Sequence, residues 1–187
     1  MRRTRALVTA VALALLLVTT GCEDDVEVKP QDFVSVDADG YGAARTAVQQ
    51  MTDDAVGSAS DRAGGESVQQ GESVGSTICK EYVDRRFRYL EQKGSFVVPR
   101  SDRDTVVQRV REAWAAKDWK PVVGGQEVAG HDDEVTAKQR SGSVDLTARA
   151  IVLENPDGGA VVNVEVRTGC LELSKEALAA DDSSPTR

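Results

Sequence analysis

The residue of this 187-residue chain with the clearest covalent chemistry is Cys22, because of what precedes it. Met1–Arg5 carries three arginines, Ala6–Val18 is apolar apart from one threonine, and the small residues Thr19-Thr20-Gly21 follow. A charged start, an apolar stretch and small residues before a cleavage point are the pattern of a signal peptide. We therefore expect residues 1–21 to be a signal peptide that is removed in front of Cys22.

The segment that ends at Cys22 resembles the bacterial lipobox, in which the cysteine becomes the lipidated first residue of the mature chain. It departs from that motif at Thr19, where leucine is usual. The apolar stretch is short for a hydrocarbon core of ~30 Å, whereas two acyl chains at ~0.8 kcal/mol per buried CH2 give stable attachment. We expect a protein secreted through the cell membrane and held on its outer face by lipid on Cys22. The alternatives are an ordinary cleaved signal with an incidental Cys22, and an uncleaved anchor.

The other two cysteines flank the region that we expect to be ordered, with Cys79 at its start and Cys170 at its end. In a chain exported to an oxidising compartment, such a pair most simply forms a disulfide. Closing a loop of about 90 residues would stabilise the fold by ~4–5 kcal/mol in the chain-entropy model. Two free buried thiols are the alternative.

The remaining reactive side chains form no catalytic pattern. His131 stands beside three acids, which could hold a divalent cation, but consecutive side chains point in different directions and Gly130 indicates a solvated turn. A single histidine excludes a His-based zinc site, and neither a Gly-x-Ser-x-Gly elbow nor a Walker loop occurs. Trp114 and Trp119 could line a sugar-binding face, although their spacing favours the core. We therefore expect no enzyme activity, no cofactor and no metal, while paired carboxylates for glycan hydrolysis stay open because no pair stands out.

Charge and composition narrow the classes of partner. The chain has 31 acidic and 23 basic side chains and a net charge of −8, and removal of the arginine-containing signal makes it more acidic still. Such a surface repels phosphate backbones, so a nucleic-acid partner is not expected. Anionic headgroups would repel it too, so attachment to the membrane needs the lipid.

The first half of the mature chain gives weak structural signals. Residues 22–40 have the acids, the proline and the turn chemistry of a tether. A helix capped by Asp39 should follow, with an apolar stripe made of Ala44, Val48, Met51 and Ala55. Residues 57–76 consist mostly of Gly, Ser, Glu, Gln and Asp, which predicts a flexible loop. Residues 78–90 fit either a strand or a helix, and Gly94 should mark a turn.

The second half gives stronger signals. A helix capped by Ser101 should run to Trp114, and Pro121 prevents its continuation. Alternating apolar residues then predict a meander with strands over 134–139, 144–153 and 160–167. Asn155-Pro156-Asp157-Gly158-Gly159 supplies its turn.

Together these elements predict an α+β domain over residues 41–172, in which two helices pack on one face of an antiparallel sheet of about four to five strands. Residues 173–187 should form a disordered tail.

Several of these features occur together in one family. The run from Cys79 to Trp114 and Trp119, the turn at 155–159 and the closing Thr168-Gly169-Cys170 resemble small actinobacterial envelope lipoproteins of unknown function. The resemblance implies a paired Cys79–Cys170 and an envelope location, and it implies no activity. We expect a non-catalytic, membrane-anchored module that binds an envelope protein or a small molecule. The alternative is a cell-wall or glycan hydrolase that uses paired carboxylates.

Overall fold

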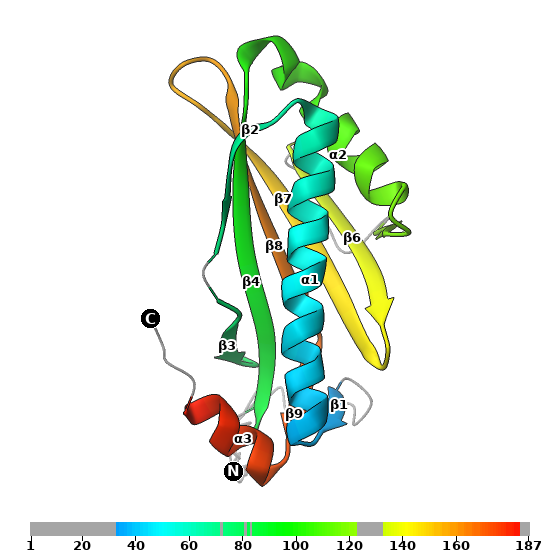
Figure 1. Cartoon of the computed structure of the whole chain (residues 1–187), viewed down its shortest axis with the longest axis vertical. Helices are drawn as coiled ribbons and strands as arrows, with labels where there is room; N and C mark the ends of the chain where they lie inside the picture. Colours follow the sequence, from blue (N-terminus) through cyan, green and yellow to red (C-terminus); the bar gives the residue numbers. More distant parts are fainter. Residues whose placement is uncertain (1–32, 72, 81, 83, 123–132, 184–187) are drawn as a thin grey trace, which may run out of the picture.

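One long helix lies across one face of a curled sheet and organises the rest of the chain (Figure 1). The computed structural model describes residues 33–71, 73–80, 82, 84–122 and 133–183. Their elements are, in chain order, β1 (Phe33–Val36), α1 (Ala38–Ala63), β2 (Glu66–Gln70), β3 (Gly75–Ile78), β4 (Phe87–Val98), a 3-10 helix (Arg100–Thr105), α2 (Val106–Ala115), β5 (Lys120–Pro121), β6 (Glu134–Ser141), β7 (Val144–Glu154), β8 (Ala160–Thr168), β9 (Cys170–Leu173) and α3 (Lys175–Asp182).

The predicted α+β class is confirmed, but the sheet is larger than expected and mixed. Its strand order is β1-β9-β4-β8-β7-β6-β5, and β2 and β3 pair with the other edge of β4. Every pairing is antiparallel except that of β1 with β9. The prediction of four to five strands missed β1, β2 and β9, which have only four or five residues and are too short to show a period-2 pattern.

Helix α1 is longer than its apolar stripe predicted. Asp37, rather than Asp39, caps it by accepting a hydrogen bond of 2.8 Å from the backbone N–H of Gly40. The helix continues through Gly57 to a left-handed Gly64, because small residues of its last turns are buried against the sheet and α2: Ala59, Ser60 and Ala63. The expectation of a flexible loop over 57–76 is therefore wrong. The polar residues there belong to the end of a helix that buries only one face and to the edge strands β2 and β3. They do not indicate a lack of structure.

Gly94 does not form the expected turn. It lies inside the twelve-residue strand β4, beside Val56 of α1. A Cβ atom at Gly94 would lie only 2.8 Å from Cγ2 of Val56 on α1. The missing side chain thus allows close packing of helix on strand. Residues 78–90, left open between strand and helix, contain the end of β3 and the start of β4.

The predicted meander is confirmed as β6, β7 and β8. Buried and exposed residues alternate along β7 and β8, and Ala150 pairs with Val164. The buried residues face α1 and α2, which lie together on one side of the sheet (Figure 1). Ser101 is not the cap of α2, because the 3-10 helix occupies that segment and α2 starts later, at Val106.

Both ends of the predicted domain extend further than expected. Residues 33–40, assigned to the tether, form β1 and the start of α1, and β1 pairs with β9 from Phe33 opposite Cys170. The expected disordered tail contains the end of β9 and the helix α3, which Ser174 caps through the N–H of Ala177 at 3.1 Å. Residues 22–32 of the tether lie outside the described residues.

A buried carboxylate holds α3 to the rest of the fold. Asp181 accepts hydrogen bonds from the Tyr41 hydroxyl and from Ser76 Oγ at 3.1 Å, and its Oδ2 lies 2.6 Å from Nη1 of Arg88. Burial and the bond to Asp181 raise the pKa of the Tyr41 phenol, so the hydroxyl stays protonated and donates at neutral pH. The polar network connects α3 with α1, β3 and β4, which explains why an Ala- and Asp-rich segment is ordered.

We expect Asp181→Asn to lower the free energy of unfolding by roughly 2–4 kcal/mol, because Arg88 and the Tyr41 hydroxyl lose a buried carboxylate partner. The matched control is Asp182→Asn, which alters a neighbouring, half-exposed carboxylate with the same chemistry and should cost less than about 1 kcal/mol. Urea unfolding of both variants measures the difference. Equal losses would show that the buried network does not hold α3.

Candidate functional site

Cys79 and Cys170 are bonded to each other, which confirms the predicted disulfide. Cys170 opens β9, and the N–H of Cys79 donates to the carbonyl of Phe87 at 2.9 Å, so the bond joins the segment between β3 and β4 to the end of the meander. Three aromatic side chains form a cluster nearby. The rings of Phe33 and Phe87 lie 5.0 Å apart, and the rings of Tyr82 and Phe87 stack at 4.2 Å.

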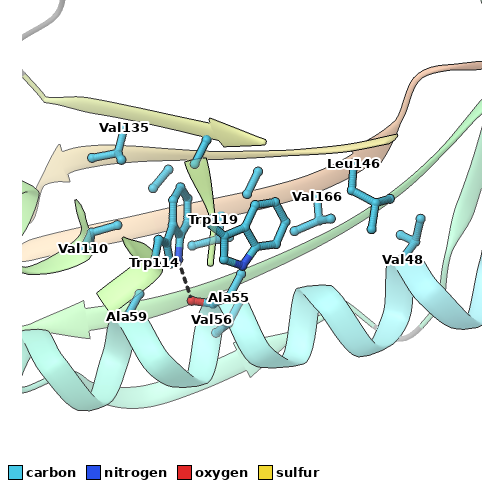
Figure 2. Packing of buried hydrophobic residues seen from close by; sticks show 14 of the residues in the cluster. Val48, Ala55, Val56, Ala59, Val110, Trp114, Trp119, Val135, Leu146 and Val166 are labelled. Carbon is cyan, nitrogen blue, oxygen red and sulfur yellow. Dashed lines mark hydrogen bonds between the residues drawn. The ribbon is translucent and has the colours of Figure 1, made fainter. Parts of the chain in front are cut away.

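Trp114 and Trp119 belong to the core, as their spacing favoured. They are 1% and 2% exposed, and their rings lie 6.0 Å apart between α1 and the strands (Figure 2). Trp114 Nε1 donates to the carbonyl of Ala55 on α1 at 3.0 Å, whereas Trp119 Nε1 has no hydrogen-bond partner among the described residues. Each ring exposes too little surface to stack on a sugar, although both residues line a hollow of about 260 Å³ beside α2 and β6.

Other residues considered in the sequence fall elsewhere. Cys22 and His131 lie outside the described residues. Within the part of the chain that the structure describes, no group of three or more His, Cys, Asp or Glu side chains could hold a metal ion. No helix in that part is both long and apolar enough to cross a membrane.

A cleft of about 880 Å³ lies at a break in the sheet. Because β9 continues the line of β8, their partners β1 and β7 lie end to end, and the cleft opens where Phe33 of β1 comes near the start of β7. Its walls are completed by β6 and by the turn between α2 and β5. The cleft therefore depends on four separate segments of the chain: β1, the turn after α2, the β6–β7 hairpin and the start of β9.

Three cations line this cleft: Lys120, Lys138 and Arg140. Lys120 and Lys138 stand directly opposite each other on β5 and β6, an arrangement of like charges that destabilises a strand pair. Among the described residues neither ammonium group has an ion-pair partner. Arg140 Nε lies 3.7 Å from Asp145 Oδ1, but both side chains are well exposed, so the pair is weak.

The turn that places Lys120 has an unusual backbone. Asp118 has a φ of 61°, and the N–H of Trp119 donates to the carbonyl of Trp114 at 3.0 Å, which ends α2 in the manner of a Schellman motif. Glycine is usual at this position because a Cβ atom disfavours the left-handed conformation. The turn directs Trp119 into the core and leaves Lys120 exposed at the cleft.

Sequence reasoning missed the cleft and its cations, although it predicted the strands β6 and β7 that form part of the lining. The polar side of β6 carries Lys138 and Arg140 at alternate positions, which a strand pattern reveals. The pairing with Lys120 and the approach of Phe33 arise from contacts between distant segments, which no local pattern encodes.

A comparison of the chain with protein-family models found no match, and neither did a comparison with curated proteins.

We expect Cys79→Ser to lower the midpoint of thermal unfolding by several degrees under oxidising conditions, because the unfolded chain gains the freedom of a 91-residue loop. Under reducing conditions the variant and the wild type should unfold at nearly the same temperature. A difference that persists after reduction would show that the serine itself, rather than the lost bond, destabilises the fold.

The two tryptophans should respond differently to the loss of the indole N–H. Trp114→Phe removes a hydrogen bond to Ala55, whereas Trp119→Phe removes a buried donor without a partner, and both create a similar loss of volume. We expect Trp114→Phe to cost about 1–2 kcal/mol more free energy of unfolding than Trp119→Phe. Denaturant unfolding measures this, and the reverse order would contradict the assignment of the two N–H groups.

Proposed function

We propose that this protein is an extracytoplasmic lipoprotein, anchored to the outer face of the cell membrane by lipid on Cys22, that acts as a non-catalytic binding module of the cell envelope. The observation that carries the proposal is the signal-peptide pattern that ends at Cys22 and directly precedes a disulfide-bonded domain. The resemblance to small actinobacterial envelope lipoproteins agrees with this proposal.

The disulfide supports the location. Cytosolic thiols are kept reduced, whereas bonds between cysteines persist in compartments outside the cell membrane. Cys79 and Cys170 lie too far apart in the sequence for a short metal-binding motif, and their bond closes most of the folded body. A chain that is exported gains this stabilisation, and a chain retained in the cytosol would not.

The arrangement of the fold supports attachment at one end. β1 begins at the end of the molecule where β9 and α3 also lie, whereas the turn between β7 and β8 lies at the opposite end (Figure 1). Cys22 precedes Phe33 by about eleven residues, so even a fully extended segment separates them by no more than roughly 40 Å. Lipid on Cys22 would thus hold the β1 end of the domain nearer the membrane.

The residues of the cleft support binding rather than catalysis. A glycan hydrolase needs a general acid whose pKa is raised by burial and a second carboxylate close to it. The acids of the cleft, Asp118 and Asp145, are exposed, and Asp145 lies beside Arg140. Trp114 and Trp119, the aromatic side chains that could have stacked on a sugar, are buried in the core.

The anchor is tested by the variant Cys22→Ala expressed in an organism with the lipoprotein pathway. Mass spectrometry should find a diacylglyceryl adduct on the N-terminal cysteine of the wild type, and the wild type should fractionate with the membranes. Cys22→Ala should lack the adduct and leave the membrane fraction, because the lipid supplies the affinity.

Cys79→Ser is the matched control, since it removes a cysteine thiol from the same chain without touching the lipidation position. It should keep the adduct and stay with the membranes. Identical mature masses of wild type and Cys22→Ala, apart from the substitution, would overturn the proposal.

A further inference from the structure

We propose that the cleft between β1, β6 and β7 binds an anionic group that carries an apolar chain, such as an alkyl phosphate. The inference rests on the binding role proposed above and names the class of ligand for it.

The charges of the cleft select an anion. Lys120, Lys138 and Arg140 outnumber the two acids that line the same space, although the whole chain has a net charge of −8. Local reversal of charge inside an acidic protein concentrates a positive potential at one site. The protein therefore offers a local basic site rather than an extended basic surface. Such a site fits a small anion better than a nucleic acid.

The two lysines show where the anion would lie. Lys120 and Lys138 face each other on paired strands, so their ammonium groups repel each other when the cleft is empty. An anionic group between them would turn this repulsion into two attractions. Arg140 lies two residues beyond Lys138 on the same side of β6 and adds a planar donor group, which suits phosphate or carboxylate oxygens.

Apolar side chains from both faces of the sheet also line the cleft. Phe33, Val34, Val144 and Leu171 line it, and Val144 and Leu171 are buried. Phe33 is only half-buried and is held by edge contacts with Phe87 and Tyr82, so part of its ring can meet a ligand. A cleft of about 880 Å³ lies within the range of small-molecule sites, roughly 300–1,000 Å³.

Cations beside partly exposed apolar side chains favour a ligand that has both a charge and a chain. A free inorganic anion would leave the exposed parts of Phe33 and Val34 in water, and an uncharged alkyl chain would leave the lysine pair unneutralised. The ligand can come from two sources. A membrane lipid is one of them, because β1 lies at the end of the domain that the lipid on Cys22 would hold nearer the bilayer. Its anionic group is either the headgroup of a membrane lipid or part of a soluble amphiphile.

The experiment uses the mature lipidated protein in phosphatidylcholine nanodiscs, titrated calorimetrically with inorganic phosphate, butyl phosphate and hexyl phosphate. Empty nanodiscs provide the blank. Hexyl phosphate should bind more tightly than butyl phosphate by about two- to fourfold for each added CH2 group, and inorganic phosphate should bind most weakly. Equal binding of hexanol or of hexyltrimethylammonium would overturn the inference, because neither carries the negative charge.

The variants Lys120→Glu and Lys138→Glu should each weaken the binding of hexyl phosphate by about tenfold, and Phe33→Ala should reduce the gain from the longer chain. Lys175→Glu is the matched control: it makes the same charge change at an exposed lysine of α3 that does not line the cleft, and it should change the affinity by less than about twofold. If hexyl phosphate does not bind, or if both cleft variants bind it as the wild type does, the inference is wrong.

Addition of phosphatidylglycerol to the nanodiscs separates the two sources. Weaker apparent binding of hexyl phosphate by the wild type, but not by Lys138→Glu, would assign the cleft to a lipid headgroup, and unchanged binding would assign it to a soluble amphiphile. The mass of the Cys22 adduct is measured on the same samples. A lipidated protein that fails to bind refutes the ligand and leaves the proposed anchor intact, whereas binding by a protein without the adduct refutes the anchor alone.

Discussion

The close approach of α1 to the sheet is the contact on which the rest of this structure depends. Aromatic residues make up only 4% of the chain, so a few large rings cannot fill the core. The helix and the sheet must instead pack at a short distance through small side chains. Ala44, Ala55 and Ala59 present a nearly flat helix face, and Gly94 lets Val56 rest on β4. The carbonyl of Ala55 on the same helix accepts the indole N–H of Trp114 and so holds α2 against α1.

Where this packing ends, a disulfide bond and a buried polar network stabilise the fold. The bond between Cys79 and Cys170 and the carboxylate of Asp181 both lie toward the end of the molecule where β1, β9 and α3 meet (Figure 1). That end consists of short strands and one short helix, which bury little apolar surface by themselves. It is also the end to which the proposed lipid on Cys22 would connect through the predicted tether.

The same construction explains why a cleft exists at all. Two different strands, β1 and β7, share one side of the line formed by β8 and β9, and a sheet built in this way has a gap where they meet. The turn after α2 and the strand β6 place lysines beside that gap, although their mutual repulsion opposes the pairing of β5 with β6. This repulsion lowers the stability of the fold at an open, partly apolar cleft. Binding of a ligand there explains the two lysines more readily than a role in folding does.

Local patterns in the sequence determined the meander, the amphipathic α2 and the burial of both tryptophans, because strands of eight or more residues and a ten-residue helix repeat their apolar positions often enough to be recognised. The cysteine pair followed from its place at the ends of the region expected to be ordered and from the predicted export of the chain, while the export and the Cys22 anchor stay predictions. Only the tertiary structure decided the continuation of α1 past Gly57, the place of Gly94 within a strand, the order of α3 and the cleft itself. The reason is physical: each of these is stabilised by residues far away in the sequence, such as Val56 for Gly94, or Tyr41 and Arg88 for Asp181.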